Sequence, residues 1–393
     1  MQTLMVSGSL RMDSTARIIV RPGGKLIVDG GTLTSACAGE MWKGICVEGH
    51  TSLPQTAACQ GMVQLLNGAT IENALCGILT CNPADSLHTT GGIITADSAT
   101  FRNCVKAVEY LPFVAHNNIG YVTDNWGSFN NCTFTVDDNN LFAANNTDFL
   151  SHVTMRDVKG VGFTRCRFED VRTQSHTRKS AISTIDAGFK IKNGCDYTLP
   201  LSNPDCNCYL TTNTYCSFTG FGTAISAATS GNPYAVTIDG ARFIDNVTGV
   251  GISGNSHAEV TRCIFHLDSI IPDYRSVTGL SLSGCTGYLV EENTFTRVAT
   301  SPSGNRYGIQ VVASGTDMNS LYRNTFERLT RGITVSGING DGDSHTGLQM
   351  TCNGFTNNTY DMYIASGATV CDNQGSTSKG ADNTFSGTQT SSL

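Results

Sequence analysis

The chain contains 393 residues, of which 39% are hydrophobic, 8% are aromatic and only 15% are charged. An average soluble domain has about 25% charged residues, and the apolar content here excludes a disordered chain or a coiled coil. The 42 glycines show no three-residue period, which excludes collagen. The formal net charge is −7 and the basic residues are scattered, so we expect no nucleic acid partner.

No apolar run approaches the roughly 20 residues that a membrane helix needs, so we expect no membrane span. The first ten residues lack the basic start and apolar core of a signal peptide, which fits a removed leader or an internal piece. Because cystines persist only in oxidising compartments, the 16 cysteines favour an extracellular or cell-surface location.

Residues 1–67 contain short apolar stretches separated by turn residues. Residues 18–20 and 26–28 are apolar, and Pro-Gly-Gly and Asp-Gly-Gly turns follow them. We interpret this region as a series of opening coils.

A short unit that ends in Phe recurs along residues 68–393. The steps between successive Phe residues run from about 22 to 34 residues, except for 50 between positions 168 and 218 (218 − 168). The anchors are Phe101, Phe134, Phe168, Phe218, Phe243, Phe265, Phe295, Phe326, Phe355 and Phe385.

A second apolar position often follows each anchor by seven residues, and glycine often precedes it, as in Gly249-Val250 and Gly332-Ile333. Alternation at period two predicts half-buried strands, and no segment sustains helical spacing. Units with two or three short strands cannot bury an apolar face alone, so they must stack. The sequence therefore predicts an all-β fold, a single-domain right-handed parallel β-helix of roughly a dozen coils over residues 1–393.

The residue two positions before Phe supports this register. The last four coils carry Asn293, Asn324, Asn353 and Asn383, which predict an amide ladder between coils. Earlier coils often carry Cys at this position. In-register Cβ atoms would lie about 4.8 Å apart, beyond the usual 3.8 Å of a disulfide, so we expect thiols there.

Residues 16–34, followed by 41–45, resemble the β-helix regions of large secreted surface proteins of the Bacteroidota, which typically use type IX secretion. The resemblance implies the same architecture but no assigned catalytic residues. The C-terminal sorting domain of that group is absent from the sequence, so the resemblance also implies a fragment or a processed product.

Two loop excursions interrupt the period, near residues 105–128 and 173–214. The second contains Cys195, Cys206 and Cys208, which favour a surface loop closed by a disulfide. A metal site there would lack the usual two-residue spacer and a nearby His, so we expect no metal.

The first excursion contains Tyr121 and Trp126, the candidate carbohydrate-binding residues. Exposed rings can stack on sugar faces, whereas buried rings would only pack the loop, and the sequence leaves both readings open. Trp42 is interpreted as a packing residue.

No catalytic residue can be assigned, and we expect no cofactor. Asp137-Asp138 and the Asp148 segment resemble polygalacturonase signatures only in reversed order, and Lys190 and Lys192 have no acidic cluster near them in sequence.

Two hypotheses remain. The first is a non-enzymatic extracellular rod, a surface stalk, adhesin or filament component that contacts glycans or neighbouring protein subunits. The alternative is a polysaccharide lyase or glycoside hydrolase with a groove along the β-helix. Carboxylates converging with Lys or Arg on an exposed face would favour the enzyme, and a smooth face of Thr, Ser and Asn would favour the rod.

Overall fold

The computed structural model describes residues 2–173, 176–194, 215–231, 234–268, 276–298, 304–375 and 378–387. It divides into two compact units, an N-terminal unit of residues 1–217 and a C-terminal unit of residues 218–393. The single domain expected for the whole chain stays a prediction. The only helices within the described ranges are two 3-10 turns, η1 (Pro83–Asp85) and η2 (Ala143–Asn145). Neither is long or apolar enough to cross a membrane.

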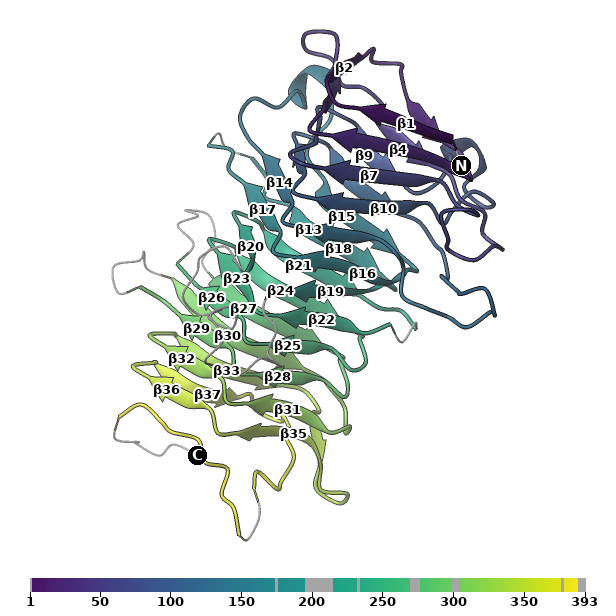
Figure 1. The fold of residues 1–393 in the computed structure, drawn as a ribbon. Helices are drawn as coiled ribbons and strands as arrows, with labels where there is room; N and C mark the ends of the chain where they lie inside the picture. The colour runs from purple at the N-terminus through teal and green to yellow at the C-terminus, as the bar shows by residue number, and fades with distance from the viewer. Residues whose placement is uncertain are drawn as a thin grey trace, which may run out of the picture. The chain divides into compact units, whose positions relative to one another are not determined.

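Each coil of the N-terminal unit contributes one strand to each of three parallel sheets (Figure 1). The first sheet has the order β1 (Gln2–Val6), β4 (Gly24–Asp29), β7 (Met62–Leu66), β10 (Ile93–Asp97), β13 (Ser128–Asn130), β16 (Lys159–Thr164) and β19 (Gly188–Lys192). The second has β2 (Ser9–Met12), β5 (Thr32–Ser35), β8 (Thr70–Glu72), β11 (Thr100–Arg102), β14 (Thr133–Val136) and β17 (Arg167–Asp170). The third has β3 (Ile18–Val20), β6 (Ile45–Val47), β9 (Cys76–Leu79), β12 (Lys106–Tyr110), β15 (Ser151–Arg156) and β18 (Ser180–Ile185).

The C-terminal unit repeats the same three sheets, and the boundary falls within β20 (Cys216–Thr219). Its first sheet contains β22 (Val236–Asp239), β25 (Glu259–Thr261), β28 (Leu289–Glu291), β31 (Asn319–Tyr322) and β35 (Thr346–Thr351), with β34 (Gly340–Asp341) antiparallel to β35. Its second contains β23 (Ala241–Ile244), β26 (Ile264–His266), β29 (Thr294–Thr296), β32 (Thr325–Glu327) and β36 (Gly354–Thr356). Its third contains β21 (Thr223–Ala228), β24 (Thr248–Ser253), β27 (Ser276–Ser283), β30 (Asn305–Val312), β33 (Arg331–Ser336) and β37 (Tyr360–Ile364). Stacked parallel sheets of this kind confirm the predicted β-helix.

A single left-handed residue helps to form the corner between the first and second sheets. Its φ lies between 51° and 58°, a region that costs a side chain-bearing residue about 1 kcal/mol or more. The next residue then enters the core. The corner residues are Ser98, Asn131, Arg165, Arg262, Glu292, Arg323, Cys352 and Asp382.

The Phe anchors lie on the inner face of the second sheet, where neighbouring rings stack. In the N-terminal unit the ring centroids of Phe101 and Phe134 lie 4.8 Å apart, and those of Phe134 and Phe168 lie 4.6 Å apart. In the C-terminal unit the column runs from Phe218 to Phe385, with centroid separations between 4.6 and 5.6 Å. Its last ring is 41% exposed. The rings therefore form much of the core of each unit.

The glycine before the second apolar position has a packing reason. A Cβ atom on Gly279 would lie 2.5 Å from the ring of Phe295, and one on Gly308 would lie 2.6 Å from that of Phe326. Gly249 faces Phe265 in the same way, at 2.8 Å. Glycine at this point lets the third sheet approach the Phe column closely.

The cysteines at the same register position are thiols, and no disulfide joins the cysteines of the described ranges. The Cys166 backbone N–H lies 3.2 Å from Cys216 Sγ. Burial raises the pKa of the Cys263 thiol to about 12. The excursion predicted near residues 173–214 is wrong over part of its length, because residues 180–185 and 188–192 form the regular strands β18 and β19. The candidate disulfide loop falls at positions 195, 206 and 208, which lie outside the described residues.

Candidate functional site

The first excursion is shorter than the sequence predicts, because β12 takes up residues 106–110. It spans residues 111–127, between β12 and β13. Two of its apolar side chains, Phe113 and Ala115, are buried against the rest of the N-terminal unit. Gly91 makes room for the aromatic ring, since a Cβ atom there would lie 2.6 Å from it. The excursion is therefore packed onto the β-helix.

A buried glutamine holds this loop at two points, His116 and Trp126. The Gln55 side chain donates to the Gly91 carbonyl at 3.2 Å and accepts from the Trp126 backbone N–H at 2.8 Å. Its own backbone N–H donates to the His116 carbonyl at 3.3 Å. Because this amide is nearly inaccessible to solvent, its bonds hold the backbone at Trp126 in one position.

The tip of the loop is a small hairpin. Residues 116 and 122 form an antiparallel bridge, and the Asn117 side-chain oxygen accepts from the backbone N–H groups of Ile119 and Tyr121, each at 3.0 Å. The Tyr121 side chain is 69% exposed and that of Trp126 is 51% exposed. Both predicted carbohydrate-binding residues thus face solvent. Trp42, in contrast, is fully buried.

An ion-pair cluster forms at Asp124, two residues before Trp126 in the chain. The Asp124 carboxylate contacts Lys190 Nζ at 2.5 Å and Lys159 Nζ at 3.8 Å. The loop backbone joins the same strand, because the Asn125 N–H donates to the Lys159 carbonyl at 2.6 Å. Gly160 lets Asp124 lie over β16, since a Cβ atom there would lie 2.3 Å from its carboxyl carbon. One carboxylate therefore serves two lysines, on the loop that carries the exposed Trp126.

A second charged cluster joins the turns that follow β14 and β17. Arg172 donates to both carboxylate oxygens of Asp170, at 2.9 and 2.8 Å, and to Asp148 at 3.1 Å. Thr173 donates its backbone N–H to Asp138 at 3.0 Å, and His176 Nε2 lies 3.1 Å from Asp170. Carboxylates 138, 148 and 170, distant in sequence, are thus brought together here.

This convergence is the kind that would favour an enzyme, but its geometry is that of an internal ion pair. The Asp170 side chain is 0% exposed and that of Arg172 is 6% exposed. The guanidinium also lies over the Phe149 ring, 5.5 Å from its centroid. Two-carboxylate hydrolysis needs both groups to reach a sugar, whereas Asp170 is enclosed by protein. The cluster holds the two turns together.

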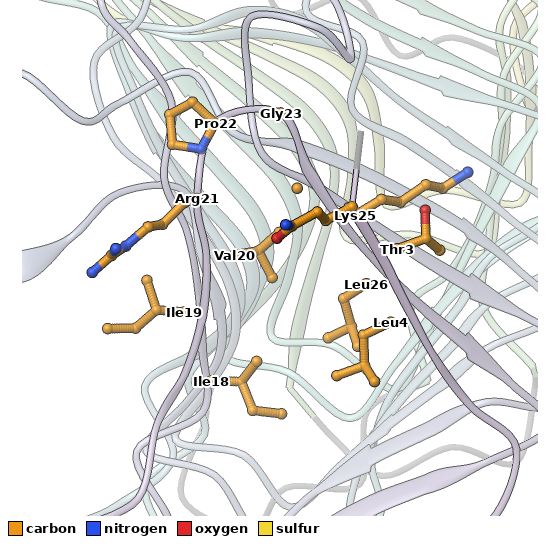
Figure 2. A pocket seen from close by; sticks show the side chains of 12 residues that line it. Thr3, Leu4, Ile18, Ile19, Val20, Arg21, Pro22, Gly23, Lys25 and Leu26 are labelled. Atoms are coloured by element: carbon orange, nitrogen blue, oxygen red, sulfur yellow. The ribbon is translucent and has the colours of Figure 1, made fainter.

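No group of three or more metal-ligating side chains suited to a cation occurs within the ranges that the structure describes. A hollow lies at the first coil, with a volume of about 750 Å³, between β1, β3 and β4. Figure 2 shows Leu4, Ile18 and Leu26 in it, with Arg21 and Lys25 extending in opposite directions. The leucines lie in register with buried core positions, so the hollow is an extension of the core. Its polar groups do not converge as in a ligand site.

A shallow groove in the C-terminal unit crosses β21, β24, β27 and β30 and has a volume of about 330 Å³. Hydroxyl-bearing side chains and glycine line it, among them Thr248, Ser281 and Gly251, together with Gln310. No charged side chain lines it. It is the smooth Thr and Ser face that would favour a non-enzymatic surface.

Residues 201–389 match the family described as right handed beta helix region. Together with the parallel strand order, this match supports a right-handed β-helix. No curated protein matches the chain. The type IX secretion context suggested by the sequence resemblance stays a prediction.

Two solved structures are similar at low identity. One is a mannuronic acid specific polysaccharide family 6 lyase from human gut microbiota, with 9% identity, a TM-score of 0.37, and coverage of 91% of this chain and 83% of the lyase. The other is tailspike protein 3 of bacteriophage CBA120, with 10% identity and a TM-score of 0.27. That match covers 100% of this chain and 58% of the tailspike chain.

The sequence analysis considered Asp138, Asp148 and Lys190 one by one, but it predicted neither charged cluster. Asp124 lies 66 residues before Lys190, so a search for acidic residues near Lys190 along the sequence could not find it. The only available signal was the register of the repeat, which places residues from successive coils side by side. An irregular loop such as 111–127 has no register, and its Asp124 could not be placed.

Proposed function

We propose that this protein is an extracellular, non-enzymatic β-helix stalk or adhesin that contacts glycans through the loop 111–127. The observation that carries the proposal is the exposure of Tyr121 and Trp126 on a loop that is itself firmly anchored. The apolar faces of sugar rings stack on such rings, and a large aromatic side chain with few rotatable bonds loses little entropy on binding.

The loop anchors make the aromatic surface suitable for binding. Phe113 and the Gln55 hydrogen bonds fix the loop before any ligand arrives, so less ordering free energy is lost on binding. Val114, Ile119 and Val122 are also exposed and extend the apolar area around Tyr121. A solvent-facing apolar patch of this kind is typical of an interaction site.

The extracellular location rests on sequence composition and on the resemblance described above. The non-enzymatic assignment draws support from the ion pair of Asp170 with Arg172, which gives the converging carboxylates a structural role. The alternative, a lyase or hydrolase, predicts cleavage of a polymer that the chain binds.

The test is a polysaccharide panel in which binding and the appearance of new reducing or unsaturated ends are recorded together. We expect binding to at least one polymer without new ends. Trp126→Ala should weaken that binding about tenfold, equivalent to roughly 1.4 kcal/mol. The matched control is Tyr360→Ala, which removes an equally exposed ring from the C-terminal unit and should leave affinity unchanged. Turnover of any polymer would overturn the non-enzymatic assignment.

A further inference from the structure

The outer face of the first sheet beside Trp126 has an unusual arrangement. Residues Ser128, Gly162 and Lys190 are in register across β13, β16 and β19. Their neighbours in the strands, Phe163 and Ile191, are buried, so this row faces outward. Neighbouring strands on such a face lie about 4.8 Å apart, so successive residues of this row have that spacing.

Glycine leaves the centre of this row bare. No heavy atom lies within 4 Å of the place that a Cβ atom on Gly162 would take. The Gly162 N–H donates to the Gly127 carbonyl at 3.0 Å. Gly127 directly follows Trp126 in the chain, so the backbone at Trp126 lies close to this strand. A ring lying over Gly162 would therefore have an indole at its side.

The charge around this position is positive. Lys159 and Lys190 share the single carboxylate of Asp124, and Lys192 projects from the same face of β19 as Lys190. The three ammonium groups thus outnumber the one carboxylate that two of them contact. The chain as a whole carries a net charge of −7, so this excess is local. We call residues 159, 162, 190 and 192 the basic face.

We propose that the basic face binds the anionic groups of an acidic polysaccharide, whose sugar ring lies over Gly162 beside Trp126. This inference rests on the proposed function, since it names the class of glycan. Lysine provides a flexible point charge that pairs with either carboxylate or sulfate. The acidic remainder of the protein would repel a long nucleic acid duplex. A single glycan chain, in contrast, can bind within the small basic area.

Matched pairs of polymers test this inference and separate the two kinds of anion. Polygalacturonate is compared with its fully methyl-esterified form, and dextran sulfate with dextran, by calorimetry at low and high salt. We expect the charged member of at least one pair to bind about tenfold more tightly at low salt, an advantage that shrinks as the Debye length falls toward about 3 Å at 1 M salt.

Two variants address the residues. Lys192→Gln should reduce affinity for the charged polymer about threefold to fivefold, as expected for one partly exposed ion pair. Gly162→Glu places a carboxylate over the bare strand, where there is space for it, and should abolish the preference for the charged polymer. The matched control is Lys43→Gln, which removes an exposed lysine elsewhere in the N-terminal unit and should change nothing. Circular dichroism confirms that each variant is folded.

The outcomes distinguish this inference from the proposed function. Equal binding of charged and neutral polymers, unaffected by Lys192→Gln and Gly162→Glu but lost in Trp126→Ala, would overturn the inference and leave glycan binding intact. Binding to no polymer, charged or neutral, would overturn both. A preference for charge that survives both basic-face variants would place the anion elsewhere and overturn the inference.

Discussion

Asn293 donates its side-chain amide to the Asn324 side-chain oxygen at 2.9 Å, and its backbone N–H reaches the same oxygen at 3.1 Å. The pattern repeats from Asn324 to Asn353 and from Asn353 to Asn383. Each amide also donates to a carbonyl of the preceding coil, such as that of Val260 for Asn293. One side chain per coil therefore satisfies buried polar groups beside the strained corner.

Replacing one member of this ladder should be costly. Asn324→Ala leaves the Asn293 backbone N–H without its acceptor in a buried site, where each unmade bond costs about 1 to 3 kcal/mol. We expect the free energy of unfolding to fall by about 3 kcal/mol, measured by urea denaturation. Asn305→Ala, at an exposed position, serves as the control and should change it by less than about 0.5 kcal/mol. Equal effects would contradict the ladder's role.

The glycines behind the Phe column should also resist substitution. Gly279→Ala would place a methyl group 2.5 Å from the Phe295 ring and 2.8 Å from the Gly308 carbonyl oxygen. Overpacking of this kind typically costs about 1 to 3 kcal/mol, which thermal unfolding would reveal. Gly342→Ala has no heavy atom within 4 Å of the added carbon and should be neutral. A neutral result at position 279 would show that the sheet and the column can separate freely.

The repeat allowed the fold to be predicted from the sequence, because residues one period apart in the sequence lie in register on neighbouring coils. The same register identifies the ring positions of Phe101 and Phe134 and the ladder position of Asn324. The loop 111–127 follows no period, and its contacts with Gln55 and Lys190 depend on folding across coils. The amino acid types indicated an aromatic loop. Its exposure and its charged neighbours depend on how the coils fold around it, so the sequence alone could not predict them.

The buried ion pair provides a third prediction. Arg172→Ala removes the cation that compensates Asp170 in a buried site, and breaking such pairs costs about 3 to 5 kcal/mol. Arg167→Ala disrupts a more exposed pair with Glu169 and should cost less than about 1 kcal/mol. Denaturant unfolding of the two variants tests the contrast. If Arg172→Ala lowers the free energy of unfolding no more than Arg167→Ala does, the cluster does not hold the two turns together. Its carboxylates then become candidates for catalytic groups.

A buried histidine should make stability depend on pH. Burial among Phe rings lowers the pKa of His152 from 6.5 to about 4. As the pH falls from 6.5 toward 4, the unfolded chain binds a proton that the folded state does not, so stability is lost on acidification. The loss approaches about 3 kcal/mol, at roughly 1.4 kcal/mol per pKa unit. His152→Phe should flatten the dependence of the unfolding free energy on pH over this range, and an unchanged slope would contradict the assignment.

The most direct test of the account is calorimetric titration of the intact chain with the tightest-binding polymer of the panel, alongside Trp126→Ala and with product ends assayed in the same samples. Non-enzymatic glycan binding through the loop 111–127 predicts saturable binding by the unmodified chain, about tenfold weaker binding by the variant, and no new polymer ends in either sample. Equal affinity of the two proteins, or accumulation of cleaved polymer, would contradict it.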